Sequence, residues 1–398
     1  MKKSKMTVVY YREKAPVSFK KAIFLAGPTP RTKEETRYSW RPKALRVLEE
    51  EGYDGVVFVP EYRDVSDFPY PDFGYKDTIK WEHDSIEMSD AILFWVPRDI
   101  KNLPGFTTNI EFGWQLQTGR VVFGAPAKAP KMDYLRYMCD RFKVKSRKTL
   151  QATIRETLRH VGEGVLREDG ERNVPLHIWN TAAFQAWYKS QKSVGNRLDG
   201  AQLTFQVSKK KRVVVWGLAT KMFVAAENRH KWNEGVFARP DLSSVVIYKP
   251  AKDILDSQVV FVKEYRQAVR NSECYVWDLP GGSAPDFGTD YLETADDEVF
   301  EETGFRPGKK RFKSHGSRQV ASTLSSHHVH LYSFEITGKE LRYFKSQKGK
   351  IHGADPENET GERVYIEIKT VREILAGDVV DWGTVGEIMK VLHTSLGR

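Results

Sequence analysis

The first third of the chain alternates short apolar runs with longer segments whose apolar positions recur at helical spacing. The apolar runs lie at residues 22–26, 56–59, 91–96 and 121–123, and the helical patterns at 33–50, 76–88 and 109–117. Short strands separated by helices predict parallel β-α units, with helices on both faces of a doubly wound sheet. In an α/β sheet of this kind, ligands bind beyond the carboxyl ends of the strands. We therefore expect ligand-binding loops at residues 27–32, 60–75 and 97–108.

The pattern changes near Leu203, where strand-like runs become more frequent. They lie at residues 213–217, 245–248, 259–264, 312–321, 329–336 and 364–368, and a helical pattern follows at 382–393. This order predicts a second domain of the α+β class, built on a mixed sheet. We therefore divide the chain into a domain at residues 1–160, a connecting segment at 161–202 and a domain at 203–398.

The connecting segment is rich in aromatic residues, namely Trp179, Phe184, Trp187 and Tyr188. Such a segment is too apolar for a loose linker, so it is expected to join the two domains tightly. It favours a helix docked against a domain, while a lid that stacks on a nucleobase is the alternative.

Composition narrows the class of protein. A hydrophobic fraction of 40% over 398 residues is enough for two folded domains, and the only cysteines, Cys139 and Cys274, exclude a disulfide framework. A net charge of +10 favours anionic partners, but no recognisable nucleic-acid motif accompanies it. We therefore expect nucleotides rather than nucleic acid as partners. The first residues lack the apolar core of a signal peptide and no run approaches a membrane span, which predicts a cytoplasmic protein with no membrane partner.

Glu111 is the first candidate for chemistry. It falls in the first turn of the helix predicted at residues 109–117, where the helix N-terminus favours an ionised carboxylate. A positioned carboxylate of this kind can attack the anomeric carbon of a sugar and hold it covalently. The sequence Thr108-Asn109-Ile110-Glu111 is also a capping-box pattern, which would make Glu111 a structural residue. The spacing alone leaves both interpretations open.

Four motifs in the first domain resemble the nucleoside 2-deoxyribosyltransferase family. They are FLAGP at residues 24–28, WE at 81–82, SDAILFW at 89–95 and TTNIEFG at 107–113. The resemblance implies that Glu111 is the nucleophile and forms a deoxyribosyl-enzyme intermediate, which a second base or water resolves. It also implies that Asp84 and Asp90 are the aspartates that hold the base and protonate it.

The same resemblance places a loop under the sugar and base of the substrate. Gly27 and Pro28 of the FLAGP motif match that loop, and glycine lets the backbone approach a ligand closely. Trp81 of the WE motif is expected to contact the substrate as well.

A second candidate site lies at residues 277–305, WDLPGGSAPDFGTDYLETADDEVFEETGF. Gly281 and Gly282 suit a tight loop before a helix. On that helix Glu298, Glu301 and Glu302 fall at i, i+3 and i+4 and therefore share one face. A hard divalent cation would neutralise their repulsion, so Mg²⁺ is the expected cofactor, with Mn²⁺ as an alternative. A solvated acidic face is the structural interpretation.

This segment resembles the Nudix box of hydrolases that cleave nucleoside diphosphates linked to another group. One residue is inserted after Gly282, Thr289 stands where the family has a glutamate, and Asp297 replaces an arginine. Residues 264–267, EYRQ, resemble the ADP-ribose pyrophosphatase branch, which implies that Arg266 lies near the phosphates of the ligand. The resemblance also implies another glutamate from a later loop, acting as base or metal ligand, for which we select Glu362.

Together these features predict a bifunctional enzyme of nucleotide metabolism. The substrate would be a nucleoside, a nucleotide or a nucleoside diphosphate sugar, and a homo-oligomer is compatible with the sequence. Two alternatives remain open. One is a nucleotide-sensing regulator whose altered box binds without cleaving, and the other is a nucleic-acid-associated protein.

Overall fold

The computed structural model describes residues 6–64, 75–209, 212–283, 290–353 and 361–395. By its contacts the chain forms two compact units, Met1–Phe237 and Ala238–Arg398, which we call unit 1 and unit 2. Among the residues described, none of the helices combines the length and apolar character needed to cross a membrane.

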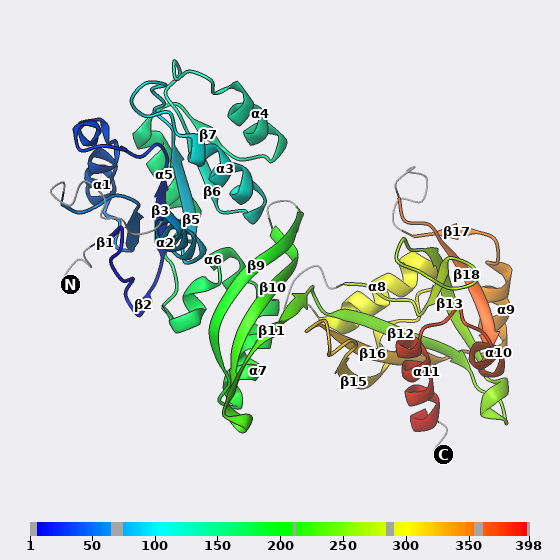
Figure 1. Cartoon of the computed structure of the whole chain (residues 1–398). Helices are drawn as coiled ribbons and strands as arrows, with labels where there is room; N and C mark the ends of the chain where they lie inside the picture. Colours follow the sequence, from blue (N-terminus) through cyan, green and yellow to red (C-terminus); the bar gives the residue numbers. More distant parts are fainter. Residues whose placement is uncertain (1–5, 65–74, 210–211, 284–289, 354–360, 396–398) are drawn as a thin grey trace. The chain divides into compact units, whose positions relative to one another are not determined.

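Unit 1 contains a six-stranded sheet in the order β1-β4-β3-β5-β6-β7, and every pairing in it is parallel. The strands are β1 (Thr7–Tyr10), β3 (Ala22–Ala26), β4 (Val56–Val59), β5 (Ala91–Trp95), β6 (Val121–Gly124) and β7 (Ser146–Arg147). The helices around it are α1 (Arg41–Glu50), α2 (Tyr75–Glu87), α3 (Phe106–Gln115), α4 (Asp133–Arg141) and α5 (Leu150–Val161) (Figure 1). A short pair, β2 (Ser18–Phe19) and β8 (Arg167–Glu168), lies outside this sheet.

Helices cover both faces of the sheet because alternate strand residues point to opposite sides. Phe94 packs with buried residues of α2, α3 and α4. Its neighbour Leu93 packs with buried residues of α1 and α5. The predicted parallel sheet in the first part of the chain is therefore confirmed, and its carboxyl edge is formed by the ends of β3, β4 and β5.

The aromatic segment continues unit 1. It contains α6 (Leu176–Trp179) and α7 (Ala182–Ser193), followed by an antiparallel sheet of β9 (Arg197–Lys209), β10 (Arg212–Val224) and β11 (Arg229–Ala238). Trp179, Phe184 and Tyr188 are buried, and the Phe184 ring lies 5.9 Å from that of Trp216 on β10. Because these rings fill a core with β10, the aromatic helix is docked within its own unit. Strands β9 and β10 belong to unit 1, which ends at Phe237, whereas the sequence pattern suggested a boundary near Leu203.

Unit 2 is built on a mixed sheet in the order β15-β16-β12-β13-β18-β17, with a further strand, β14, paired to β13. The strands are β12 (Leu242–Lys249), β13 (Gln258–Tyr265), β14 (Tyr275–Asp278), β15 (Lys313–Gln319), β16 (His328–Glu335), β17 (Ile351–His352) and β18 (Val364–Thr370). Only the β12–β16 pairing is parallel among those described. Residues of α8 (Tyr291–Thr303) and α9 (Gly338–Ser346) pack on one face, and residues of α10 (Val371–Ala376) and α11 (Trp382–Ser395) on the other (Figure 1).

Candidate functional site

The loop after β3 is pressed between the end of β5 and the start of α1. A Cβ atom at Gly27 would lie 2.2 Å from the carbonyl oxygen of Trp95 and 2.9 Å from the Trp40 ring. Only glycine fits such a close approach. The indole Nε1 of Trp40 donates to the carbonyl oxygen of Pro28 at 3.3 Å. The Gly27-Pro28 loop is therefore fixed at the carboxyl edge of the sheet, where the sequence predicted a ligand-binding loop.

Arg41, the first residue of α1, holds the same loop and is only 1% exposed. Its Nε donates to Leu25 O and its Nη2 to Gly27 O, both at 3.0 Å. Its Nη1 donates to Pro28 O at 3.3 Å and to Glu61 Oε1 at 2.6 Å. The guanidinium is thus fully engaged by three backbone carbonyls and one carboxylate.

Two glutamates lie within electrostatic reach of Arg41 and of each other. Glu82 is on α2 and Glu111 on α3, and both side chains are partly buried. Burial, followed by the charge of Glu82, raises the pKa of Glu111 to about 8. Burial raises the pKa of Glu82 to about 7, and the Arg41 guanidinium lowers the pKa of both groups. Both carboxyl groups therefore titrate near neutral pH, with Glu111 the more readily protonated of the two.

Two expectations about Glu111 are corrected by the start of α3. The helix begins at Phe106, with Gly105 as its N-cap in the left-handed region at φ +64° and without a side-chain cap. The capping-box interpretation of residues 108–111 is therefore wrong, because Glu111 lies in the second turn. The helix dipole acts mainly on the first turn, so burial and Glu82 dominate, and the carboxyl group is not held ionised as expected.

Asp90 is placed away from Glu111. It precedes β5, at the amino edge of the sheet, and is 2% exposed. Its carboxylate accepts from the Ala22 amide at 2.9 Å, from the Leu176 amide at 3.0 Å and from Arg167 Nη2 at 2.6 Å. All of these bonds connect elements of unit 1, so the geometry gives Asp90 a structural role instead of the substrate contact that the resemblance implied.

Asp84 and Trp81 also differ from their expected places. The Asp84 carboxylate is 52% exposed and forms an ion pair with Lys80 on the outer face of α2. The indole of Trp81 is partly buried, donates from Nε1 to Glu13 O at 3.1 Å and packs edge-on against Tyr11. Neither side chain joins the carboxylate pair.

Glu82, and not Asp84, is the acid of α2 whose charge acts on Glu111. The two residues are two positions apart on α2, which turns their side chains to opposite sides of the helix. The signal was present in the WE motif at residues 81–82. Choosing between the two acids required knowing which face of α2 is covered, and the partial burial of Glu82 beside an exposed Asp84 supplies that information.

In unit 2, the loop after β14 lies on the acidic face of α8. The Gly281 amide donates to Glu302 Oε2 at 2.9 Å, and a Cβ atom at Gly282 would lie 2.1 Å from Glu298 Oε1. Burial raises the pKa of Glu302 well above its ordinary range. Burial, followed by the charges of Glu301 and Glu362, raises the pKa of Glu298 to about 7. The structure therefore brings the predicted glycine loop and glutamates together, with Glu301 as the exposed member.

Arg266 and Glu362 join the same cluster. The Arg266 Nη2 lies 2.5 Å from Glu264 Oε2 and 3.4 Å from Glu362 Oε1. Burial raises the pKa of Glu264 to about 6, against the lowering effect of Arg266. Two residues distant in sequence, which we predicted for phosphate binding and base catalysis, are thus neighbours.

The donor chemistry of this cluster suits a hard divalent cation, because every candidate ligand is a carboxylate oxygen. Within the described ranges, however, no three His, Cys, Asp or Glu side chains are already spaced as a metal site. Asp297 points away from the cluster and pairs with Arg306 Nη1 at 3.1 Å, beside a 3.0 Å contact of the same atom with Asp296. Thr289, the other departure from the Nudix box, lies outside the described residues.

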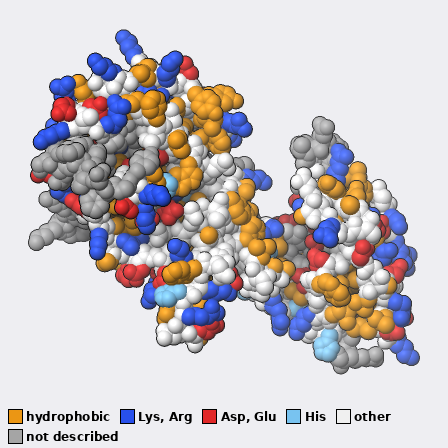
Figure 2. Space-filling model, in the orientation of Figure 1, with side chains coloured by type: hydrophobic (Ala, Val, Ile, Leu, Met, Phe, Trp, Pro, Cys, Tyr) orange, Lys and Arg blue, Asp and Glu red, His pale blue; other side chains and the backbone are white. Residues whose placement is uncertain are grey.

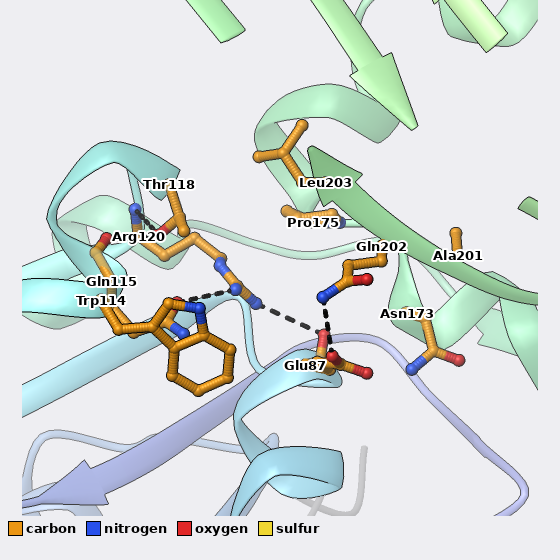
Figure 3. Close-up of a pocket in the computed structure, with 10 residues that line it drawn as sticks. All are labelled: Glu87, Trp114, Gln115, Thr118, Arg120, Asn173, Pro175, Ala201, Gln202 and Leu203. Carbon is orange, nitrogen blue, oxygen red and sulfur yellow. Dashed lines mark hydrogen bonds between the residues drawn. The ribbon is translucent and has the colours of Figure 1, made fainter. Parts of the chain in front are cut away.

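A separate hollow in unit 1 is too small for a nucleoside. It is lined by Glu87, Trp114, Arg120 and Gln202 among others, and its volume of about 30 Å³ holds one or two water molecules (Figure 3). Gln202 Nε2 donates to Glu87 Oε1 at 3.2 Å across it, and Arg120 Nη2 donates to Gln115 Oε1 at 3.0 Å. Because of these bonds, the hollow is a small hydrogen-bonded interface between α2, α3 and β9.

The basic side chains do not form a continuous stripe on the face shown in Figure 2, where they are scattered among acidic and apolar ones. The net charge of +10 therefore has no matching surface there for a nucleic-acid backbone.

Comparison with known proteins supports the first resemblance. Residues 20–129 match the family model described as "Nucleoside 2-deoxyribosyltransferase like". No curated protein matches the chain. Residues 20–129 thus form a nucleoside 2-deoxyribosyltransferase-like domain, which contains Gly27, Arg41, Glu82 and Glu111. The match suggests glycosyl transfer on a nucleoside, and it gives no support to a Nudix domain in unit 2.

Proposed function

We propose that unit 1 cleaves or exchanges the N-glycosidic bond of a nucleoside or nucleotide, with Glu111 as nucleophile and Glu82 as proton carrier. The observation that carries this proposal is the partly buried pair Glu82 and Glu111, which titrates near neutral pH and lies within electrostatic reach of Arg41. Arg41 in turn donates to the carbonyls of Gly27 and Pro28. A mechanism with a covalent sugar–enzyme intermediate uses one carboxylate to attack and one carboxylic acid to give a proton to the leaving group.

The proposed reaction has two steps. The reactive form has Glu111 ionised and Glu82 protonated, which is the less populated of the two single-proton forms because Glu111 has the higher pKa. In that form the Glu111 carboxylate attacks C1′ while the C1′–N bond breaks, and the leaving base takes a proton from Glu82. Water or a second base then attacks C1′, gives a proton to Glu82 and releases the Glu111 carboxylate. The second nucleophile decides between hydrolysis and transfer.

Base release from a panel of ribonucleosides, 2′-deoxyribonucleosides and their 5′-monophosphates tests this proposal. Glu82→Gln and Glu111→Gln should each lose base release, since each removes one role of the pair. Asp84→Asn is the matched control, because it changes a carboxylate on the exposed face of the same helix. A loss in Asp84→Asn with full activity in Glu82→Gln would contradict the assignment.

We also propose that unit 2 hydrolyses a nucleoside diphosphate derivative with the help of Mg²⁺ or Mn²⁺. Glu298, Glu301 and Glu302 would hold the cation, which would neutralise phosphate charge and lower the pKa of water. Arg266 would bind a phosphate and Glu362 would accept a proton from water. The supporting observation is the group of buried carboxylates with raised pKa beneath the glycine loop.

A nucleotide sensor is the second candidate for unit 2. It is favoured by Asp297, which carries a charge opposite to that expected in the box and is paired with Arg306. Turnover of nucleoside diphosphate sugars with and without Mg²⁺, beside binding of the same compounds, separates the two candidates. Binding without turnover at any metal concentration would favour the sensor.

A further inference from the structure

Arg41 carries a positive charge at a place in the fold where positive charge is electrostatically unfavourable. It is the first residue of α1, where the helix N-terminus already carries partial positive charge. Its side chain is also almost completely buried, although burying a guanidinium is costly unless its donors are satisfied. The donors of Arg41 are satisfied by three backbone carbonyls and by Glu61, which holds the guanidinium at this position.

The contacts of Arg41 point toward the carboxyl edge of the sheet. Three of its hydrogen bonds end on the carbonyls of Leu25, Gly27 and Pro28, which belong to the loop expected under the substrate. The planar fork of a guanidinium can reach three fixed acceptors at once, which an ammonium group does less well. Arg41 thus defines the conformation of this loop.

The charge of Arg41 also acts on the carboxylate pair. Among the described residues, Arg41 is the charged group that acts on Glu82, and Arg41 and Glu82 are those that act on Glu111. Glu61, in the loop after β4, faces Arg41 and partly offsets its charge. Arg41 is therefore a cation that favours ionisation of the two partly buried carboxyl groups.

We infer that Arg41 is the positioning residue of this site: it fixes the loop at residues 25–28 and supplies the fixed positive charge that allows one carboxyl group of the Glu82–Glu111 pair to ionise. This inference rests on the function proposed for unit 1. It makes the nucleophile depend on a residue that need not touch the reacting atoms.

Carboxyl titration by NMR in the full chain tests the electrostatic half directly and needs no substrate. The side-chain carboxyl carbons of glutamate would be labelled with ¹³C, and Glu82→Gln and Glu111→Gln would assign the two signals. In Arg41→Met the titration midpoints of the pair should rise by about one pH unit or more, because a nearby cation is lost. Arg41→Lys should shift them less. Arg63→Met is the matched control, since Arg63 is an exposed arginine paired with Glu13, and it should shift neither.

Kinetics test the positioning half. With the nucleoside that the panel identifies, Arg41→Lys should keep the pH profile but raise KM about tenfold, since the fork that holds three carbonyls is lost. Arg41→Met should in addition move the acidic limb of the kcat profile to higher pH. A purely structural role predicts a uniform fall in activity with neither change.

Unchanged titration midpoints in folded Arg41→Met would overturn the inference. If Arg41→Met does not fold, Glu61→Gln replaces it, because removing the acid that offsets Arg41 should lower both midpoints, and unchanged midpoints there would overturn the inference instead. Shifted midpoints in a protein that turns over no nucleoside would refute the proposed function while the electrostatic role of Arg41 stands.

Discussion

The two units bury glutamates in different electrostatic settings. In unit 1, the pair Glu82 and Glu111 lies within reach of Arg41, whose guanidinium is buried and fixed by backbone carbonyls. In unit 2, the charges of Glu298 and Glu362 act on Glu302, and Arg266, which pairs with Glu362, is 58% exposed. A buried fixed charge is weakly screened, whereas an exposed one is screened by water.

This difference suggests two ways of compensating the negative charge of buried glutamates. Unit 1 carries its own compensating charge, and its two glutamates titrate near neutral pH, which suits acid–base and nucleophilic chemistry. Unit 2 keeps an excess of negative charge that only protonation or an added cation relieves. We therefore expect the first site to respond mainly to pH and the second mainly to divalent metal, and the predictions below test this contrast.

The largest effect is expected from Glu111→Ala. Loss of the nucleophile should reduce base release by roughly a thousandfold or more, while diphosphate cleavage stays unchanged because the two sites lie in different units. Base release is read by chromatography. Mass spectrometry of the unmutated protein with a slow substrate should show a sugar adduct on Glu111, and an adduct on another residue would refute the assignment.

The reciprocal prediction concerns Glu302→Gln. The near-isosteric amide still offers an oxygen to the Gly281 amide, so the loop should keep its place while the charge needed for the cation is lost. Metal-dependent diphosphate cleavage should be abolished and base release unaffected. Formation of nucleoside monophosphate is measured across a Mg²⁺ titration, and full activity at limiting Mg²⁺ would show that this site does not depend on the acidic face of α8.

The pH dependence of stability should separate the pair from an ordinary surface acid. The folded pKa values of Glu82 and Glu111 lie above those of the unfolded chain, so the folded state binds more protons between about pH 4.5 and 8. Their contribution to stability is therefore complete below about pH 4.5 and is lost as pH rises toward 8. The double variant Glu82→Gln, Glu111→Gln should be stabilised relative to the unmutated protein by about 1–3 kcal/mol at pH 8, with little difference at pH 4.5.

Urea unfolding at several pH values measures this effect. Asp84→Asn serves as the control, since an exposed carboxylate should give a flat difference. An equal effect of the double variant at pH 4.5 and pH 8 would mean that the pair is not protonated in the folded protein near neutral pH.

The sequence predicted much of this arrangement because its strongest signals are local. The apolar run at residues 22–26 and the Gly27-Pro28 turn define a strand and its loop without knowledge of the rest of the chain. In unit 2, the spacing of Glu298 and Glu302 on one helix and the glycines before them was likewise sufficient to bring loop and acids together.

The predictions of site residues failed where the exposure of a side chain depends on which face of its helix or strand is covered by other elements. Asp90 looked like a site residue until three long-range hydrogen bonds showed it at the amino edge of the sheet. Glu82 and Asp84 are equally acidic, and only the packing of α2 decides which one is buried. Arg41 could not be selected from the sequence either, because three of its partners are backbone carbonyls, which carry no residue-specific signal, and the fourth, Glu61, is distant in sequence.

The smallest effect is expected from restoring the altered box in unit 2. Asp297 is paired with Arg306, and both side chains are about half exposed or more, so breaking this pair should cost less than about 1 kcal/mol. Asp297→Arg alone should do little for turnover, since it brings a second cation toward Arg306. Thr289→Glu combined with Asp297→Arg should raise turnover and lower the Mg²⁺ requirement. A glutamate and an arginine at these positions can pair with each other, whereas a threonine and an aspartate cannot. Steady-state formation of nucleoside monophosphate over a Mg²⁺ series measures both quantities. If the double variant gains nothing, and the unmutated protein binds nucleotide without cleaving it, unit 2 is a sensor and the contrast between the two acidic sites is one between catalysis and binding.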